Sequence, residues 1–240
     1  MRRDRSPFPV AIEKALPAWL STRRWFGGKA RSIRRASVRD ALPLSGEGYS
    51  ASLLLLEVAY RSGSPELYLL PVSSLPVPDP SALILRRGDA AWSECISDPR
   101  FWSLLLSIVA KRRKIIGATG SIMGVRTAPW TASNLPFRPG GTEQSNSSAF
   151  FGDSLFLKLY RKLTDGINPE VEILGALAQR RKPRILSLRL HRFCLPRRCR
   201  PPHPCLRRRL RRRLRLRRPL PRPRSMLARP TLIARLPACS

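Results

Sequence analysis

The acidic residues of this chain all lie at or before Glu172, and this division of charge constrains the fold more than any motif does. Of the 46 basic residues, 25 lie in residues 1–180 and 21 in residues 181–240, while all 15 acidic residues lie in the first part. The first part therefore has a formal charge of +10, the difference between 25 and 15, and the last sixty residues have +21. Only residues 1–180 have the apolar content of a globular protein, and one or two small domains are predicted there.

Residues 181–240 have the composition of a shifted reading frame. They contain 20 Arg, 12 Leu, 10 Pro and 2 His, with no acidic residue, glycine, valine or tryptophan. These four residue types share codons that begin with C, which a shifted frame in GC-rich DNA would give. We interpret the change as a frameshift near residue 180, natural or introduced by sequencing. The segment is predicted to be disordered, because like charges repel and prolines interrupt helices.

The arginine-rich tail leaves one alternative function open, which is binding of nucleic acid. Its 20 arginines would displace counterions and give salt-dependent binding without sequence preference. Phe193 is the only aromatic residue there, so bases would have little to stack on, and such binding is expected to be incidental. The spacing of Cys194, Cys199, His203 and Cys205 does not fit paired zinc ligands, and no metal site is predicted.

The first part of the chain predicts helices and antiparallel strands together. An amphipathic helix is expected near residues 8–20, followed by a basic and aromatic turn. Strands are expected over residues 51–60 and 66–72, and the turn-rich sequence RSGSP between them predicts a hairpin. Residues 90–114 are typical of a helix whose stronger part begins at Asp98.

The candidate chemistry lies in residues 143–172, with the sequence EQSNSSAFFGDSLFLKLYRKLTDGINPEVE. The short polar residues from Ser145 to Ser148 favour a turn whose backbone amides stay open to an anion. Gly152 and Asp153 predict a two-residue hairpin turn between two apolar strands. The hairpin places a lysine within its second strand.

That lysine, Lys158, costs energy inside an apolar strand unless its ammonium reaches an anion. Asn168 and Pro169 predict the start of a helix, and Glu170 and Glu172 follow at once. A strand lysine, a helix glutamate and a polar turn are the parts that hold the phosphates of ATP in the small lobe of a kinase. An ordinary surface hairpin with a solvated lysine is the alternative interpretation.

Three segments of this stretch, EQSNSS, LKLYRK and GINPEVEI, resemble the bacterial maltokinases, which are ATP-dependent kinases related in fold to aminoglycoside phosphotransferases and protein kinases. The sequence LPAWLSTRRWFGGKAR resembles the start of the N-terminal cap of that family. The fold class is therefore predicted as α+β, an antiparallel-sheet cap with a helix, then an incomplete kinase-like small lobe and a disordered basic tail. The predicted domains are a cap (1–90), a linking helix and intermediate segment (91–134), a partial small lobe (135–180) and the tail (181–240).

The resemblance also implies roles for individual residues. Six residues are implied to bind the nucleotide: Ser145, Asn146, Ser147 and Ser148 over the ATP phosphates, Lys158 in contact with them, and Glu172 as the residue that orients Lys158. The family uses ATP and Mg²⁺ to convert maltose to maltose 1-phosphate for glycogen synthesis, and several members are fused to trehalose synthase, which is implied as a partner.

The catalytic part of the family pattern is missing from this sequence. In the family, the catalytic aspartate and the acidic metal ligands lie in the large lobe, in a His-Gly-Asp-x-His loop and a later Asp-containing motif, and neither motif occurs here. No catalytic or metal-binding residue is therefore nominated, and the chain alone is expected to be inactive.

No secretory signal or membrane span is expected. Pro7 and Pro9 interrupt the start of the chain, and Glu13 and Lys14 add charge to it. No apolar run approaches the roughly 20 residues that cross a bilayer. Cys95 is the only cysteine before the tail, which agrees with a cytoplasmic location and no membrane partner.

Overall fold

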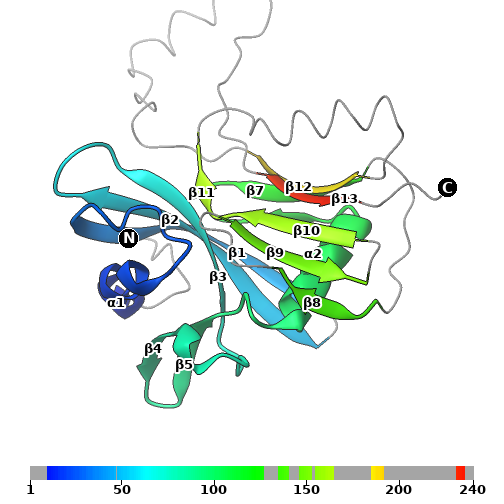
Figure 1. Ribbon diagram of the computed structural model, residues 1–240, viewed down its shortest axis with the longest axis horizontal. Coiled ribbons are helices and arrows are strands. Elements are labelled where there is room, and N and C mark those ends of the chain that lie inside the picture. The colour runs from blue at the N-terminus through cyan, green and yellow to red at the C-terminus, as the bar shows by residue number, and fades with distance from the viewer. Residues whose placement is uncertain are drawn as a thin grey trace, which may run out of the picture.

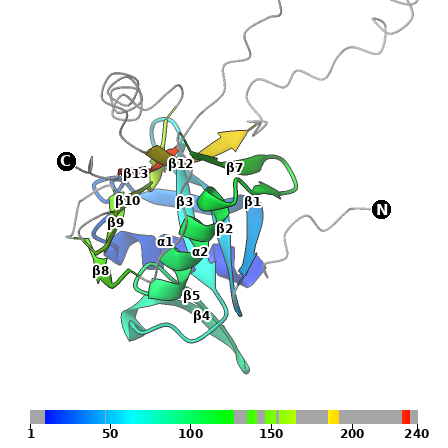
Figure 2. The ribbon, with the colours of Figure 1, turned by 90° about the vertical axis from the view of Figure 1, so that its right-hand side faces the viewer.

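The structure is a computed structural model that has two antiparallel sheets and two α-helices in the residues that it describes, and the α+β class is confirmed. Helix α1 (Val10–Thr22) packs on one face of the first sheet, and helix α2 (Pro99–Ala110) packs between the opposite face and the second sheet (Figure 1; Figure 2). Neither helix, within the part of the chain described, is long and apolar enough to span a membrane. The residues that the structure describes are 10–46, 48–126, 135–140, 146–152, 155–164, 185–191 and 231–235.

The first sheet is formed by consecutive segments of the chain in the order β1-β2-β3-β5-β4. The predicted hairpin of two strands is confirmed as β2 and β3, which pair antiparallel. Strand β1 was not predicted, because its arginines and two register shifts obscure the alternation of a strand. The strands of the first sheet are β1 (Ile33–Gly46), β2 (Tyr49–Tyr60), β3 (Glu66–Ser73), β4 (Leu83–Arg87) and β5 (Ala90–Glu94).

Both faces of the first sheet are buried, which explains a run of four leucines in β2. Successive side chains of a strand point to opposite faces. Leu54 and Leu56 therefore belong to the outer core, the cluster packed against α1, while Leu53 and Leu55 belong to the shared core, the cluster packed against α2. A strand buried on both faces reads as a continuous apolar run rather than an alternating one.

The helix predicted over residues 90–114 is shorter than expected. Residues 90–94 form β5 instead, and Lys114 begins strand β6, so the helix occupies only residues 99–110. Its start is where the sequence placed it: Asp98 caps the helix by accepting a hydrogen bond from the backbone N of Arg100 at 2.9 Å. The alternating pattern AAWSE suits a strand, and Asp98 with the following proline separates it from the helix.

The second sheet collects strands from distant parts of the chain in the order β6-β7-β12-β13-β10-β9-β8. Residues 185–191 and 231–235 form two of these strands, so the predicted disorder of the tail is wrong for these two segments. Both are apolar and short of arginine compared with their surroundings. The strands are β6 (Lys114–Ile116), β7 (Ser121–Arg126), β8 (Phe137–Pro139), β9 (Asn146–Phe151), β10 (Leu155–Tyr160), β12 (Ile185–His191) and β13 (Thr231–Arg235).

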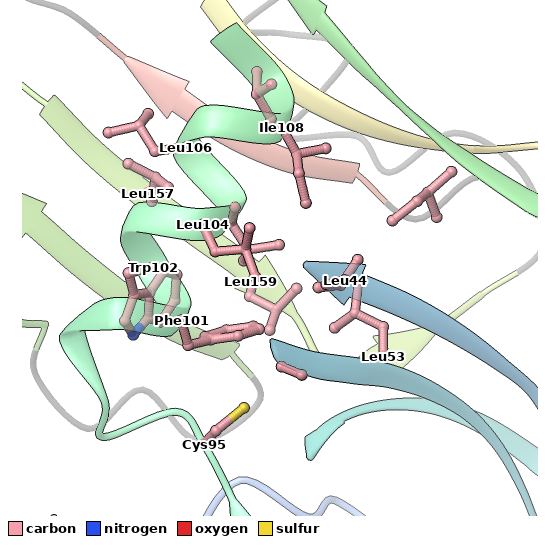
Figure 3. Close-up of a cluster of buried hydrophobic side chains, with 14 of the residues drawn as sticks. Leu44, Leu53, Cys95, Phe101, Trp102, Leu104, Leu106, Ile108, Leu157 and Leu159 are labelled. Atoms are coloured by element: carbon pink, nitrogen blue, oxygen red, sulfur yellow. The ribbon is translucent and has the colours of Figure 1, made fainter. Parts of the chain in front are cut away.

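The shared core joins the two sheets through α2, as Figure 3 shows. Trp102 and Phe101 of the helix lie among leucines of both sheets, and Leu157 and Leu159 enter from β10. Strand β7 approaches the helix so closely that a Cβ on Gly124 would lie 2.5 Å from the carbonyl oxygen of Ile108. The second sheet therefore packs directly on α2, which also covers one face of the first sheet.

A two-residue strand, β11 (Lys162–Leu163), extends the first sheet with chain that comes from the second. It follows β10 with only Arg161 between them, and it pairs antiparallel with β3, Lys162 opposite Tyr68. The backbone N of Leu69 donates to the carbonyl oxygen of Arg161 at 2.7 Å. The chain thus passes from one sheet to the other within a single residue (Figure 1).

Candidate functional site

The nominated residues that the structure describes lie on the hairpin of β9 and β10. Asn146, Ser147 and Ser148 belong to strand β9, so the predicted polar turn is wrong for these three residues. Their backbone pairs with the apolar strand β10, and the carbonyl oxygen of Ser148 accepts from the backbone N of Gly140 on the other side, at 2.8 Å. These three residues are therefore part of the sheet rather than of an open turn. Ser145 lies outside the described residues.

The connection of this hairpin sets which residues face each other. Strand β9 ends at Phe151 and β10 begins at Leu155, so three residues join them rather than the predicted two. A two-residue turn would have placed Ser147 opposite Lys158, whereas the observed register places Ser148 there. Gly152 begins the connection with a φ of +54°, a conformation that glycine adopts readily.

Lys158 shares one face of the hairpin with two of the nominated residues. Directly opposite residues of antiparallel strands lie on the same face, so Ser148 accompanies Lys158, and Asn146 accompanies Tyr160 two positions along. Lys158 is half-buried, and its Nζ lies 5.6 Å from the centre of the Tyr160 ring. One ammonium beside a hydroxyl and an amide forms a small polar surface suited to an anion.

The side chain of Ser148 fits against Gly140, the residue that follows the neighbouring strand β8. A Cβ on Gly140 would lie 2.0 Å from the Oγ of Ser148, so a larger residue at position 140 would displace the hydroxyl. The absence of a side chain at Gly140 therefore leaves room for the group that faces Lys158.

Ser147 points to the opposite face, where it contacts a residue that the sequence did not single out. Arg161 is fully buried, and its Nη1 donates to the Oγ of Ser147 at 3.3 Å. Its Nη2 forms a buried ion pair with Glu94 of β5, and its Cζ lies 3.9 Å from the centre of the Trp25 ring. An arginine at a strand end resembles a solvated residue, so only the fold reveals this role.

A second ion pair joins β11 to the first sheet at Glu66. The Nζ of Lys162 donates to Oε1 of Glu66 at 2.6 Å, and the Nη1 of Arg31 lies 3.2 Å from the same oxygen. The hydroxyls of Tyr60 and Tyr68 donate to Oε2, each at 2.6 Å. Burial alone would raise the pKa of Glu66, but hydrogen bonds from Lys162, Tyr60 and Tyr68 outweigh it and hold the pKa at about 2.

Possible metal ligands are not clustered in the described residues. Among them, no three His, Cys, Asp or Glu side chains come together as a metal site. The carboxylates near the hairpin in the sequence lie outside the described ranges: Glu143, Asp153, Asp165, Glu170 and Glu172. The ion pair predicted between Glu172 and Lys158 therefore stays a prediction, and no chemical step is assigned to a metal.

One cavity, of about 440 Å³, lies away from these residues, between α1 and the turn that follows it. Its lining includes Phe26, Gly28, Lys29 and Arg61, and none of the nominated residues. A Cβ on Gly28 would lie 2.2 Å from the hydroxyl oxygen of Tyr60, so the glycine serves close packing.

These features define an α+β protein with a helix-covered antiparallel domain, fixed by buried and half-buried ion pairs to a lysine-bearing hairpin. Residues 19–91 match the family model of the maltokinase N-terminal cap domain. The chain thus carries a maltokinase-family N-terminal cap, as the resemblance implied. The match spans the last turn of α1, strands β1 to β4 and the start of β5. The domain limits predicted beyond it stay predictions.

Proposed function

We propose that this chain comprises the cap and the nucleotide-side hairpin of a maltokinase-like, ATP-dependent sugar kinase. The parent reaction transfers the γ-phosphate of ATP to the anomeric hydroxyl of maltose, giving maltose 1-phosphate and ADP for α-glucan synthesis. The cap match at residues 19–91 supports the family, and the hairpin follows the cap in the order that the resemblance requires.

The register of the hairpin is the observation on which the proposal rests. It places Lys158 opposite Ser148 on a half-buried face. In this proposal the ammonium of Lys158 neutralises phosphate oxygens, while the Ser148 hydroxyl and the Asn146 amide bind them through hydrogen bonds. Ser145 and Glu172 would complete the site, as the resemblance implies.

Binding, rather than catalysis, is the activity proposed for this chain alone. No aspartate or glutamate follows Glu172, so the sequence does not supply the catalytic base or the acidic metal ligands of the family. The frameshift near residue 180 stays a prediction, and reading the other frames of the encoding DNA for a His-Gly-Asp-x-His loop tests it. Maltose specificity, a trehalose synthase partner and a cytoplasmic location are likewise proposals.

The alternative function, nucleic-acid binding through the tail, also stays a prediction. Most of its arginines lie in residues 192–230, which are outside the described ranges.

A fluorescent ATP analogue tests the proposal with the full chain. Lys158→Met is expected to weaken binding about tenfold, which corresponds to ~1.4 kcal/mol. Lys114→Met is the matched control, because it removes the same charge from an exposed position of the same sheet and should leave the affinity unchanged. Titration at about 0.3 M salt screens the strong net charge of the chain. Equal affinities for the two variants would contradict a site at Lys158.

A further inference from the structure

We infer that Arg161 is a positioning residue that couples the cap to the nucleotide-binding hairpin, so that nucleotide affinity depends on the attachment of the cap. This inference rests on the proposed function. It starts from the contrast between Arg161 and its surroundings: the Arg161 side chain is charged but fully buried, directly after strand β10.

Arg161 contacts three segments that are far apart in the sequence. Trp25 comes from the turn after α1, Glu94 from β5, and Ser147 from β9. Its carbonyl oxygen accepts from the backbone N of Leu69 in β3, at 2.7 Å. Trp25 lies in the matched cap, Glu94 lies just beyond it at the end of β5 in the sheet of the cap, and Ser147 lies in the hairpin, so a single residue fixes the hairpin against that sheet.

The buried ion pair favours one position of the hairpin over shifted positions. A guanidinium out of water is costly unless a carboxylate and further hydrogen bonds compensate it, and Glu94 and Ser147 supply both. Any displacement of the hairpin away from the cap would leave Arg161 and Glu94 as unpaired buried charges. The docked arrangement is therefore strongly preferred over arrangements in which the strand has shifted.

Arg161 is linked to the candidate site along both strands of the hairpin. Along β10 it follows Lys158 by three residues, and across the hairpin it holds Ser147, the neighbour of Ser148. Because Ser148 and Lys158 face each other, a change in the register or tilt of either strand alters the polar face that they share. Loss of Arg161 is thus transmitted to Lys158 without direct contact.

The adjacent Lys162 provides a matched control. Its ion pair with Glu66 also joins the hairpin chain to the cap, but the Lys162 side chain is 41% exposed, whereas that of Arg161 is 0% exposed. Exposed ion pairs contribute little, because water and salt screen them. Lys162→Met therefore removes the same charge at the next residue with a small expected effect on the hairpin.

Two measurements on the full chain test the inference. The first is hydrogen exchange: Arg161→Met should raise the exchange rates of amides in β9 and β10 about tenfold relative to those in β1 and β2, and Lys162→Met should not. The second is binding of the fluorescent ATP analogue, which Arg161→Met should weaken about tenfold and Lys162→Met less than twofold.

A double variant separates positioning from simple structural support. Arg161→Met with Glu94→Gln removes both buried charges, so the melting temperature should recover compared with Arg161→Met alone. Positioning predicts that nucleotide affinity does not recover, because no ion pair holds the hairpin to the cap. Recovery of both the melting temperature and the affinity would overturn the inference.

The outcomes remain distinct from a failure of the proposed function. If the wild-type chain shows no binding that depends on Lys158, the nucleotide proposal fails, and hydrogen exchange alone decides whether Arg161 holds the hairpin to the cap. Exchange that rises equally in all strands, or does not change, would overturn the coupling. If Arg161→Met does not melt cooperatively, the double variant is compared with the wild-type chain in both measurements.

Discussion

The two sheets of this protein differ in how their strands are drawn from the chain. Five strands of the first sheet follow one another between Ile33 and Glu94, joined by connections of at most nine residues. The second sheet brings β13 beside β10, with Phe156 opposite Arg235. Pairing of distant segments requires closure of long loops, which costs entropy and slows folding. The comparison shows that the first sheet is built from neighbouring segments of the chain, whereas the second needs distant segments, and both pack on α2.

The variant with the largest expected effect is Trp102→Ala in the shared core. Trp102 is 1% exposed, and its Nε1 donates to the carbonyl oxygen of Ile96 at 2.8 Å. We expect a loss of about 4 kcal/mol in the free energy of unfolding, measured in urea, because a large cavity forms. Ile116→Ala, at an exposed residue, should change it by less than about 0.5 kcal/mol. Similar effects of both variants would contradict a common core.

A sharper test uses two neighbouring leucines of β2. Leu53 faces the shared core and Leu54 the outer core, and both are fully buried. Leu53→Ala and Leu54→Ala should each cost about 3 kcal/mol. Hydrogen exchange should then distinguish them, with Leu53→Ala loosening α2 and the second sheet and Leu54→Ala loosening α1. The same exchange pattern in both variants would show that the two faces are not independent.

Glu66→Gln tests, through its pH dependence, the cluster of the first sheet in which Lys162, Arg31, Tyr60 and Tyr68 all contact the Glu66 carboxylate. The pKa of Glu66 is lowered from 4.5 to about 2, so the folded state favours the carboxylate. Its stabilising contribution is complete above pH 4.5 and is lost as the pH falls towards 2. We expect about 2 kcal/mol between wild type and variant at neutral pH, discounted for the partly exposed cations.

Denaturation across that pH range measures the effect. The difference between wild type and Glu66→Gln should shrink towards acid pH. A difference that stays constant from neutral pH down to pH 2 would show that Glu66 stabilises the fold by packing alone. Glu57→Gln removes a similarly exposed ion pair with Arg39 and serves as the control. Its effect at neutral pH should be smaller, because Glu66 also accepts hydrogen bonds from Tyr60 and Tyr68.

The smallest expected effect comes from the cap of the shared helix. Asp98→Ala removes the acceptor for the backbone N of Arg100, and about 1 kcal/mol of stability should be lost. Asp98→Asn keeps an acceptor oxygen and should therefore lose less stability than Asp98→Ala. Thermal melts compare the two variants, and equal losses would indicate that the ion pair with Arg100, rather than the helix cap, is responsible.

The sequence predicted the elements whose patterns are local. The apolar run of β2 and the Asp98-Pro99 start of α2 are where the residues placed them. Strand β1 was missed because charged residues lie along it and its partner β2 determines its register. Apolar content near residue 90 favoured a helix, but pairing with β3 and β4 makes that segment a strand.

The candidate site was predicted in part, for a similar reason. The sequence placed Lys158 in the second strand of a hairpin, and the structure agrees. The face that each serine occupies depends on one extra residue in the hairpin connection, which the turn residues alone did not indicate. Arg161 could not be identified, because its burial is created by Trp25 and Glu94, more than 60 positions away in the sequence.

The pairing of β11 with β3 also bears on the behaviour of the cap in isolation. A fragment that ends at residue 91 would lack Arg161 and β11, leaving open the edge of β3 that they cover, including the backbone N of Leu69 that donates to Arg161. Open edges of this kind join to those of other molecules, and aggregation follows. A soluble fragment of the cap would therefore need another strand paired with this edge of β3.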